Sequence, residues 1–316
     1  MATLAQGVTF RAFTRELSVT PLTGQVLKHI LSFMNTLPKT KQAAILKALT
    51  EGSSIRSTAR MVGVSKTTVL RLLVEVGELC AIYQDYTLRN LPCRRIEADE
   101  IWAFVGAKQR NAKRQGDGDI WTFTALDSET KLMVTWLVGP RSLENAHRFM
   151  HDLHSRLANR VQLTTDGNSQ YVSAVEGAFG WQGVDFAQLV KYYSADHGPG
   201  GRYSPPVCTG IDKTRVMGNP DSAKVSTSFV ERQNLTLRMN ARRFTRLTNA
   251  FSKKVENHAH AVALHFMVYN FCRSHGTLTK AAHGIHTTPA MAAGVADHLW
   301  TVEELVGLLD PARLLQ

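Results

Sequence analysis

Three acidic residues stand at positions where a carboxylate suggests chemistry. Asp99 lies within an apolar run, where an ionised carboxylate is costly unless it is paired or bound to a cation. Asp166 closes the short apolar stretch RVQLTTDG, and Glu231 heads a segment, residues 226–254, in which the next seven charges are all positive. If the fold brings these acids together, divalent cations would offset their repulsion, and oxygen ligands of this kind favour Mg²⁺ or Mn²⁺.

Two such ions activate a water or a 3′-hydroxyl and stabilise the leaving oxygen in an in-line attack on phosphorus. The acids therefore predict nuclease or strand-transfer chemistry, with Asp99, Asp166 and Glu231 as ligands of two Mg²⁺ ions. The seven cations that follow Glu231 would then hold the phosphates of a nucleic acid next to the bound metal ions.

Each acid also has an ordinary structural interpretation. Asp99 shares a strand face with Glu97 and would be solvated if that strand lay at the edge of a sheet. Asp166 and the glycine after it form a common turn pair. Ser228 and Glu231 have the spacing of a capping box, in which the glutamate bonds back to the cap amide.

The elements that would position the acids follow from hydrophobic periodicity. Period-two alternation predicts strands, and apolar residues three and four apart predict helices. The resulting order is a strand at 94–107, a hairpin at 119–139, a helix at 142–158 capped by Ser142, a strand at 160–167, a helix at 168–179 and a strand at 185–194. This order predicts an α/β fold with a mixed sheet flanked by helices, a meander at one side and crossovers at the other.

The front of the chain predicts an all-α helix-turn-helix domain over residues 38–90. Residues 55–74 suit two short helices around a turn at Gly63, with Ser65 capping the second helix. The first turns of that helix would present Lys66, Thr67, Thr68 and Arg71 to DNA. A three-helix bundle that does not bind DNA is the alternative. Residues 1–90 carry eleven Lys and Arg against five Asp and Glu, which favours DNA binding.

Composition points to a polyanionic partner. The chain has 316 residues, a formal charge of +11 and a pI near 9.7, as expected of a protein that displaces counterions from a phosphate backbone. No apolar run has the length of a membrane span, and the start lacks the apolar core of a signal peptide. The four cysteines are scattered, which predicts neither disulfides nor a zinc ribbon. We expect a cytoplasmic, nucleoid-associated protein.

The remaining segments complete the predicted domains. Residues 91–285 form the catalytic domain, within which residues 194–224, rich in Gly, Pro and cations, are predicted to be a long loop that orders on DNA. Residues 1–37 are predicted to be a helical segment of unclear role, and residues 286–316 a helical tail. The predicted DNA contacts outside the helix-turn-helix are Arg202, Lys213, Arg215, Arg232, Arg242, Arg243, Arg246, Lys253 and Lys254.

Several stretches together resemble transposases of the IS1 family: ADEIWAFVGAKQRN, TTDGNSQY, RYSPPVCTG, the long segment 226–259 and TTPAMAAGVADHLW. The resemblance implies an RNase H-like domain with a DDE triad, which falls on Asp99, Asp166 and Glu231. It also implies a basic partner on the helix of the glutamate, which falls on Arg238. Related members carry a cysteine-rich, zinc-finger-like segment before the helix-turn-helix, and this sequence has none.

The sequence thus predicts an IS1-like DNA transposase that binds the ends of its element and cleaves and joins DNA. Its partners would be double-stranded DNA, as element ends and as target, and at least one further copy of the chain in a synaptic complex. A DNA-binding regulator with a structural acid cluster and a simple metal-dependent nuclease are the alternatives.

Overall fold

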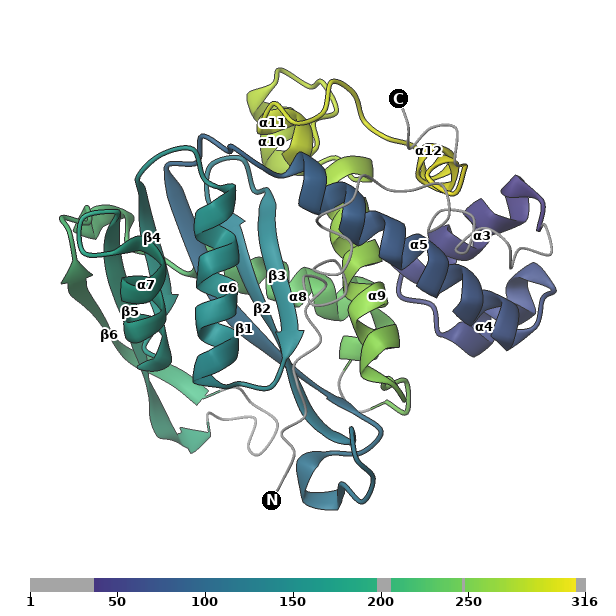
Figure 1. The fold of residues 1–316 in the computed structure, drawn as a ribbon, viewed down its shortest axis with the longest axis horizontal. Helices are drawn as coiled ribbons and strands as arrows, with labels where there is room; N and C mark the ends of the chain where they lie inside the picture. Colours follow the sequence, from purple (N-terminus) through teal and green to yellow (C-terminus); the bar gives the residue numbers. More distant parts are fainter. Residues whose placement is uncertain (1–36, 198–205, 246–247, 311–316) are drawn as a thin grey trace.

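The computed structural model describes residues 37–197, 206–245 and 248–310. A six-stranded mixed sheet forms the left-hand half of the molecule in Figure 1. Its strands are β1 (Arg95–Val105), β2 (Gly118–Asp127), β3 (Met133–Gly139), β4 (Val161–Asp166), β5 (Val184–His197) and β6 (Pro206–Met217). They are ordered β3-β2-β1-β4-β5-β6. The pairs β1–β4 and β4–β5 are parallel and the others are antiparallel, so the predicted meander and crossovers are confirmed.

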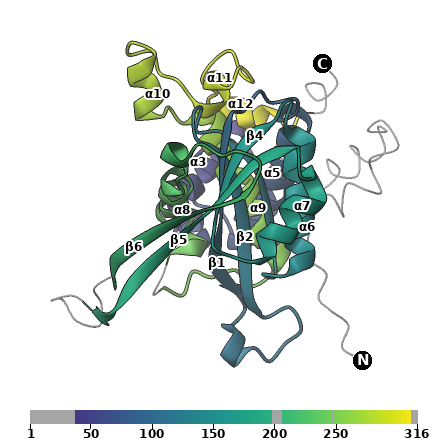
Figure 2. The ribbon, with the colours of Figure 1, turned by 90° about the vertical axis from the view of Figure 1, so that its left-hand side faces the viewer.

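Helices cover both faces of the sheet (Figure 2). Helices α6 (Leu143–Arg156) and α7 (Gln170–Phe179) pack on one face, and α8 (Ser228–Asn240) and α9 (Val255–Met267) pack on the other. The alternation along β1 explains the two layers, because Ile96 and Ala98 enter one core cluster, whereas the odd-numbered apolar residues from Ile101 onward enter the second. The predicted mixed sheet flanked by helices is confirmed.

Three helices form the front of the described chain: α3 (Lys39–Thr50), α4 (Ile55–Val62) and α5 (Lys66–Thr87). Gly63 ends α4 with a φ of +67°, and the Ser65 hydroxyl accepts a hydrogen bond from the Thr68 amide, as predicted. The expectation of two short helices is wrong for the second, because α5 runs for 22 residues. It packs against α9, and Gly77 permits this contact, since a Cβ there would lie 2.6 Å from His260.

The predicted long loop at 194–224 is wrong over much of its length. Strand β5 continues to His197, and β6 returns beside it in antiparallel pairing, with Tyr192 opposite Gly210. The hairpin extends away from the body of the molecule (Figure 2). Lys213 and Arg215 therefore lie on an edge strand. The remainder of the segment includes a 3₁₀ turn, η3 (Ser222–Lys224), and Arg202 lies outside the described residues.

Shorter elements complete the fold. They are η1 (Gln109–Asn111), η4 (Arg242–Phe244), η5 (Val268–Cys272), α10 (Gly276–Ala281), α11 (Pro289–Ala292) and α12 (Val302–Gly307). Within the described part of the predicted tail, α11 and α12 are short helices, and α12 packs against α3, where Lys47 Nζ and Glu303 Oε1 are 2.7 Å apart. No helix in the described ranges is both long and apolar enough to span a bilayer. Residues 1–36 lie outside the described residues.

Candidate active site

Asp99 and Asp166 meet on neighbouring strands. Strands β1 and β4 pair in parallel with Ala98 opposite Thr165, so the residues that follow lie side by side. Carboxylate oxygens of Asp99, Glu100 and Asp166, which we call the acid group, lie within 4.8 Å of one another. The edge-strand interpretation of Asp99 is wrong, because β1 has a partner strand on each side.

Asp99 is the most strongly perturbed member of the acid group. Burial raises its pKa to about 7, the charges of Asp166, Glu100 and Glu231 add to the effect, and a hydrogen bond from the Glu100 amide opposes it. The Asn234 side chain, from α8, donates to Asp99 Oδ2 at 2.8 Å. The carboxylate form is thus held at an energetic cost that a bound cation would offset.

Glu100 reaches the acid group from the opposite face of β1, where it meets a cation. Arg141 Nε donates to Glu100 Oε1 at 3.1 Å, and Arg141 Nη2 lies 3.6 Å from Asp166 Oδ2. Asn168, just after β4, donates to the same Glu100 oxygen at 2.9 Å. The guanidinium also lies over the Trp121 ring, 5.0 Å from its centroid, so one arginine is placed to neutralise part of this cluster.

Glu97 determines where helix α8 begins. Its Oε2 accepts hydrogen bonds from the backbone amides of Phe229 and Val230, at 2.8 and 3.1 Å. These are first-turn amides, which have no partner within the helix and favour an acceptor of negative charge. The contact ties the start of α8 to the central strand, two residues before Asp99, and thereby places Glu231 on the side of the sheet that Asp99 faces.

Glu231 faces the acid group but does not belong to it. Its charge raises the pKa of both aspartates, while its Oε1 accepts hydrogen bonds from Lys191 Nζ at 2.5 Å and from the Thr227 hydroxyl at 2.7 Å. The capping-box interpretation is wrong, because α8 starts at Ser228 with Thr227 in the cap position, and no side chain there accepts an amide hydrogen bond.

The predicted basic residues are spread over several elements: the start of α5, the edge strand β6, helix α8, the turn η4 and the segment before α9. Arg238 is half-buried on α8, two turns beyond Glu231. Thr68 and Arg243 are half-buried, and Arg246 lies outside the described residues. The exposed members of the predicted set are Lys66, Thr67, Arg71, Lys213, Arg215, Arg232, Arg242, Lys253 and Lys254.

Sequence reasoning missed Glu97, Glu100, Arg141, Lys191 and Asn234 as parts of the site. Asn234 carried a usable signal, because it follows Glu231 by three residues and therefore lies on the same helix face. Arg141 and Lys191 carried no such signal, because they lie 41 and 40 residues along the chain from their acidic partners, Glu100 and Glu231.

Residues 92–194 match the family model described as IS1 transposase, DDE_Tnp_IS1. The predicted family resemblance is confirmed over these residues. The IS1-like segment contains Asp99 and Asp166 and ends before Glu231. Among solved structures, the crystal structure of a pre-cleavage Mos1 transpososome is similar at 12% identity, covering 82% of this chain and 91% of that chain with a TM-score of 0.19. No curated protein matches the chain.

Proposed function

We propose that the protein is a DNA transposase of an IS1-like insertion sequence, which binds the ends of its element and catalyses DNA cleavage and strand transfer through Asp99, Asp166 and Glu231. The observation that carries the proposal is the meeting of Asp99 and Asp166 on adjacent parallel strands, in a group whose oxygens lie within 4.8 Å of one another. The strand order, a meander followed by two parallel crossovers, supports an RNase H-like catalytic domain.

The acid group has the composition expected of a divalent metal site. It offers only hard oxygen donors, which suit Mg²⁺ and Mn²⁺, and burial together with the neighbouring carboxylates raises the pKa of Asp99, an effect that a bound cation would oppose. Asp99 and Asp166 would hold the ions together with Glu231, and Glu100 is a further candidate ligand. When bound, two such ions supply an activated nucleophile and stabilisation of the leaving oxygen.

The chain's own residues would orient this chemistry. Asn234 holds the Asp99 carboxylate by a hydrogen bond, and Arg141 fixes Glu100 and offsets the charge of Asp166. Arg238, on the helix of Glu231, would contact a phosphate of the bound DNA. Each contact limits the rotamers of a ligand, and positioning of this kind is a large part of catalysis in phosphoryl transfer.

Helices α4 and α5 would recognise the element ends as a helix-turn-helix. The turn at Gly63 and the cap at Ser65 expose Lys66, Thr67 and Arg71 at the start of α5, which is where such a motif presents side chains to the major groove. A synaptic complex that holds two ends requires at least two copies of the chain, so we propose a dimer or larger assembly on DNA.

A cleavage and joining assay tests the proposal. Labelled duplexes carrying the ends of the element, one of them already cut at the 3′ end, are incubated with Mg²⁺ or with Ca²⁺. We expect Mg²⁺-dependent cleavage and joining that Asp166→Asn abolishes and Asp221→Asn leaves intact, because Asp221 is an exposed acid on the connection before α8.

The other outcomes separate the alternatives. Cleavage without joining of the pre-cut end would favour a metal-dependent nuclease. End binding that is unchanged in Asp166→Asn, with no cleavage under Mg²⁺ or Mn²⁺, would favour a DNA-binding regulator and overturn the proposal.

A further inference from the structure

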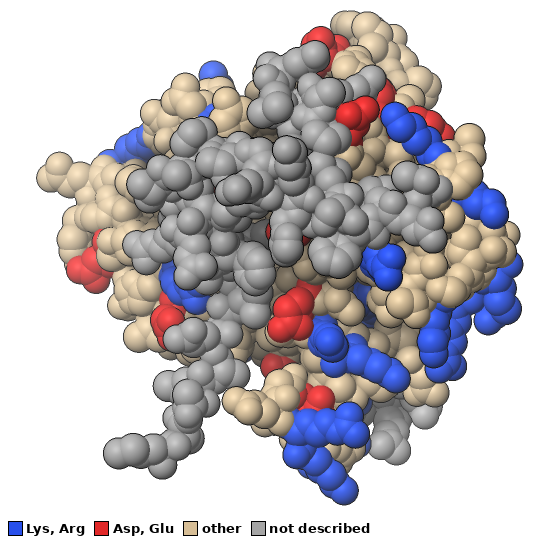
Figure 3. Space-filling model, turned by 45° about the vertical axis from the view of Figure 1, so that its right-hand side comes forward, with Lys and Arg blue, Asp and Glu red and all other residues tan. Residues whose placement is uncertain are grey.

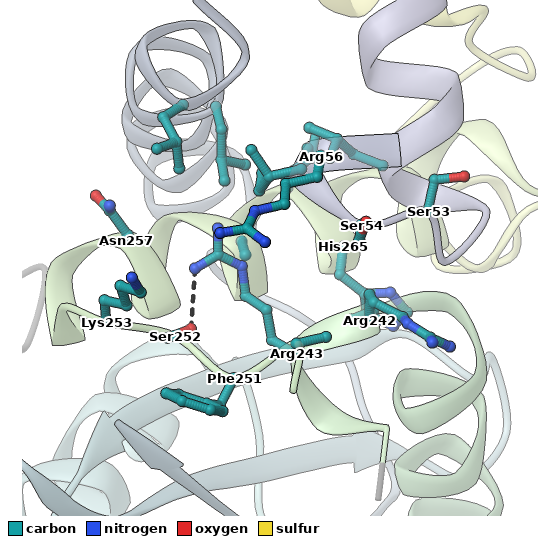
Figure 4. A pocket seen from close by; sticks show the side chains of 18 of the residues that line it. Ser53, Ser54, Arg56, Arg242, Arg243, Phe251, Ser252, Lys253, Asn257 and His265 are labelled. Atoms are coloured by element: carbon teal, nitrogen blue, oxygen red, sulfur yellow. Dashed lines mark hydrogen bonds between the residues drawn. The ribbon is translucent and has the colours of Figure 1, made fainter. Parts of the chain in front are cut away.

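A cleft separates the front helices from the body of the molecule, away from the acid group. It has a volume of about 700 Å³ and is lined by the end of α3, the starts of α4 and α5, the turn η4, residues 248–253 and part of α9. Figure 4 shows Arg56, from α4, and Arg243, from η4, extending into this space from opposite walls. We call it the basic cleft.

The lining of the basic cleft carries charge of one sign. Its cations come from both walls, and among the described residues that line it none is Asp or Glu; the cations are Arg56, Lys66, Arg242, Arg243 and Lys253. None of the five forms an ion pair with any acid in the described parts of the chain. Lys and Arg also gather over the right-hand and lower part of the face in Figure 3.

Arg243 shows that this charge is held at a cost. It is half-buried, and its Nη1 donates to the Ser252 hydroxyl at 2.9 Å, while that hydroxyl is also 3.0 Å from His258 Nδ1. Burial lowers the Arg243 pKa to about 10, so the guanidinium is still charged at neutral pH. Burial, with the adjacent Arg243, lowers the His258 pKa to about 3, so the imidazole is neutral. A partly dehydrated cation without a counter-charge favours binding of an anion.

We propose that the basic cleft binds backbone phosphates of duplex DNA and so joins the front helices and the catalytic body on one DNA molecule. This inference rests on the proposed function for its choice of DNA as the ligand. Guanidinium groups suit the site because they bind phosphate oxygens in a bidentate fashion. Two arginines on opposite walls would hold one DNA strand between them, and the apolar side chains of Leu70 and Phe251 in the lining suit contact with sugars.

The test is the salt dependence of DNA binding by the full chain without catalytic metal, measured with a labelled duplex between about 50 and 200 mM salt. Arg56→Gln and Lys253→Gln remove exposed cations of the cleft, whereas Arg110→Gln on η1 and Lys280→Gln on α10 remove equal charge outside it. The logarithm of the association constant falls linearly with the logarithm of the salt concentration, and each lost phosphate contact should make this line less steep by about 0.9. Between about 50 and 200 mM salt, the affinity of the variant should therefore fall about 3.5-fold less than that of the wild type. The control variants should keep the wild-type slope.

Equal slopes for cleft and control variants would overturn the inference, provided that thermal unfolding shows all four variants to be folded. Stabilisation of the wild type by inorganic phosphate, lost in Arg56→Gln without any change in the DNA slope, would assign the cleft to a small anion and also overturn it. The assay is independent of the proposed chemistry. Mg²⁺-dependent cleavage together with unchanged slopes in the cleft variants would refute only the proposal that the cleft binds DNA. Less steep slopes in those variants, without any cleavage by the wild type, would refute only the proposed transposase function.

Discussion

Divalent-ion affinity should increase with pH, because the carboxylate of Asp99 must lose its proton before it can bind a cation. With a pKa of about 7, about one tenth of the Asp99 side chains are ionised at pH 6 and about nine tenths at pH 8. This group alone should therefore tighten Mn²⁺ or Mg²⁺ binding about tenfold between those values. The pKa of Asp166 and that of Glu100 are also raised, and their effect has the same sign.

Isothermal titration in two buffers of different ionisation enthalpy measures both the affinity and the protons released. At pH 6.5 we expect about 0.8 proton released from Asp99 for each binding event, falling to about 0.1 at pH 8. Asp99→Asn should weaken binding and remove the part of the pH dependence that Asp99 contributes, and Asp221→Asn should do neither. An affinity that is constant from pH 6 to pH 8, or no proton release at pH 6.5, would refute the assignment of Asp99 as a buried ligand.

The same ionisation should affect the stability of EDTA-treated protein. Because the folded pKa of Asp99 lies above its ordinary value of 3.8, the native state binds the proton more tightly, and the free energy of unfolding falls as pH rises from about 4 to about 7. The separation of the two pKa values sets a ceiling of about 4 kcal/mol. Comparison of the wild type with Asp99→Asn isolates this contribution from that of other acids.

Two further predictions concern the elements that position the sites, and urea unfolding checks both. Gly63→Ala should lower the free energy of unfolding by about 1 kcal/mol because the φ of +67° at this position is unfavourable for alanine. Gly276 has equally open space around it and no positive φ, so Gly276→Ala should not destabilise the protein. Equal effects of the two substitutions would show that backbone strain is not the cause. Glu97→Ala should cost about 2 kcal/mol by leaving two first-turn amides of α8 without an acceptor, and Glu97→Gln, which keeps an acceptor, should cost much less. If both Glu97 variants lost similar amounts of stability, the negative charge of Glu97, and not its role as a hydrogen-bond acceptor, would be what stabilises the start of α8.

The core of the fold could be predicted because its signals are local. Strands β1 to β4 each contain an apolar run or a stretch of alternation, such as Ile101 to Val105 in β1, and α6 begins at the predicted cap, Ser142, whose hydroxyl accepts the Asn145 amide. Asp99 and Asp166 were found for the same reason, since a carboxylate inside an apolar strand or at its carboxyl end stands out from its neighbours.

The incorrect predictions arose where neighbouring elements override local composition. The Gly and Pro content of residues 194–224 suggested a loop, but β5 immediately before it supplies a row of backbone partners, and β6 pairs along that row. As an edge strand, β6 leaves much of its length exposed, so it lacks the apolar alternation that marks a half-buried strand. Helix α5 was predicted to be too short because its packing partner, α9, lies nearly 180 residues further along the chain, as the contact of Gln84 with Ala263 shows.

The charges of the site suggest an order in which cations and substrate would bind. With all groups ionised, the acid group and Glu231 carry four negative charges, which Arg141 and Lys191 reduce to two. One divalent ion would neutralise that remainder, and a second would leave the site with an excess of two positive charges, which is unfavourable at low dielectric. Under the proposed function, a phosphate of the bound DNA strand would supply negative charge at the same place. The two-ion arrangement should therefore be complete only with DNA present, and the titration without DNA should show one strong binding event.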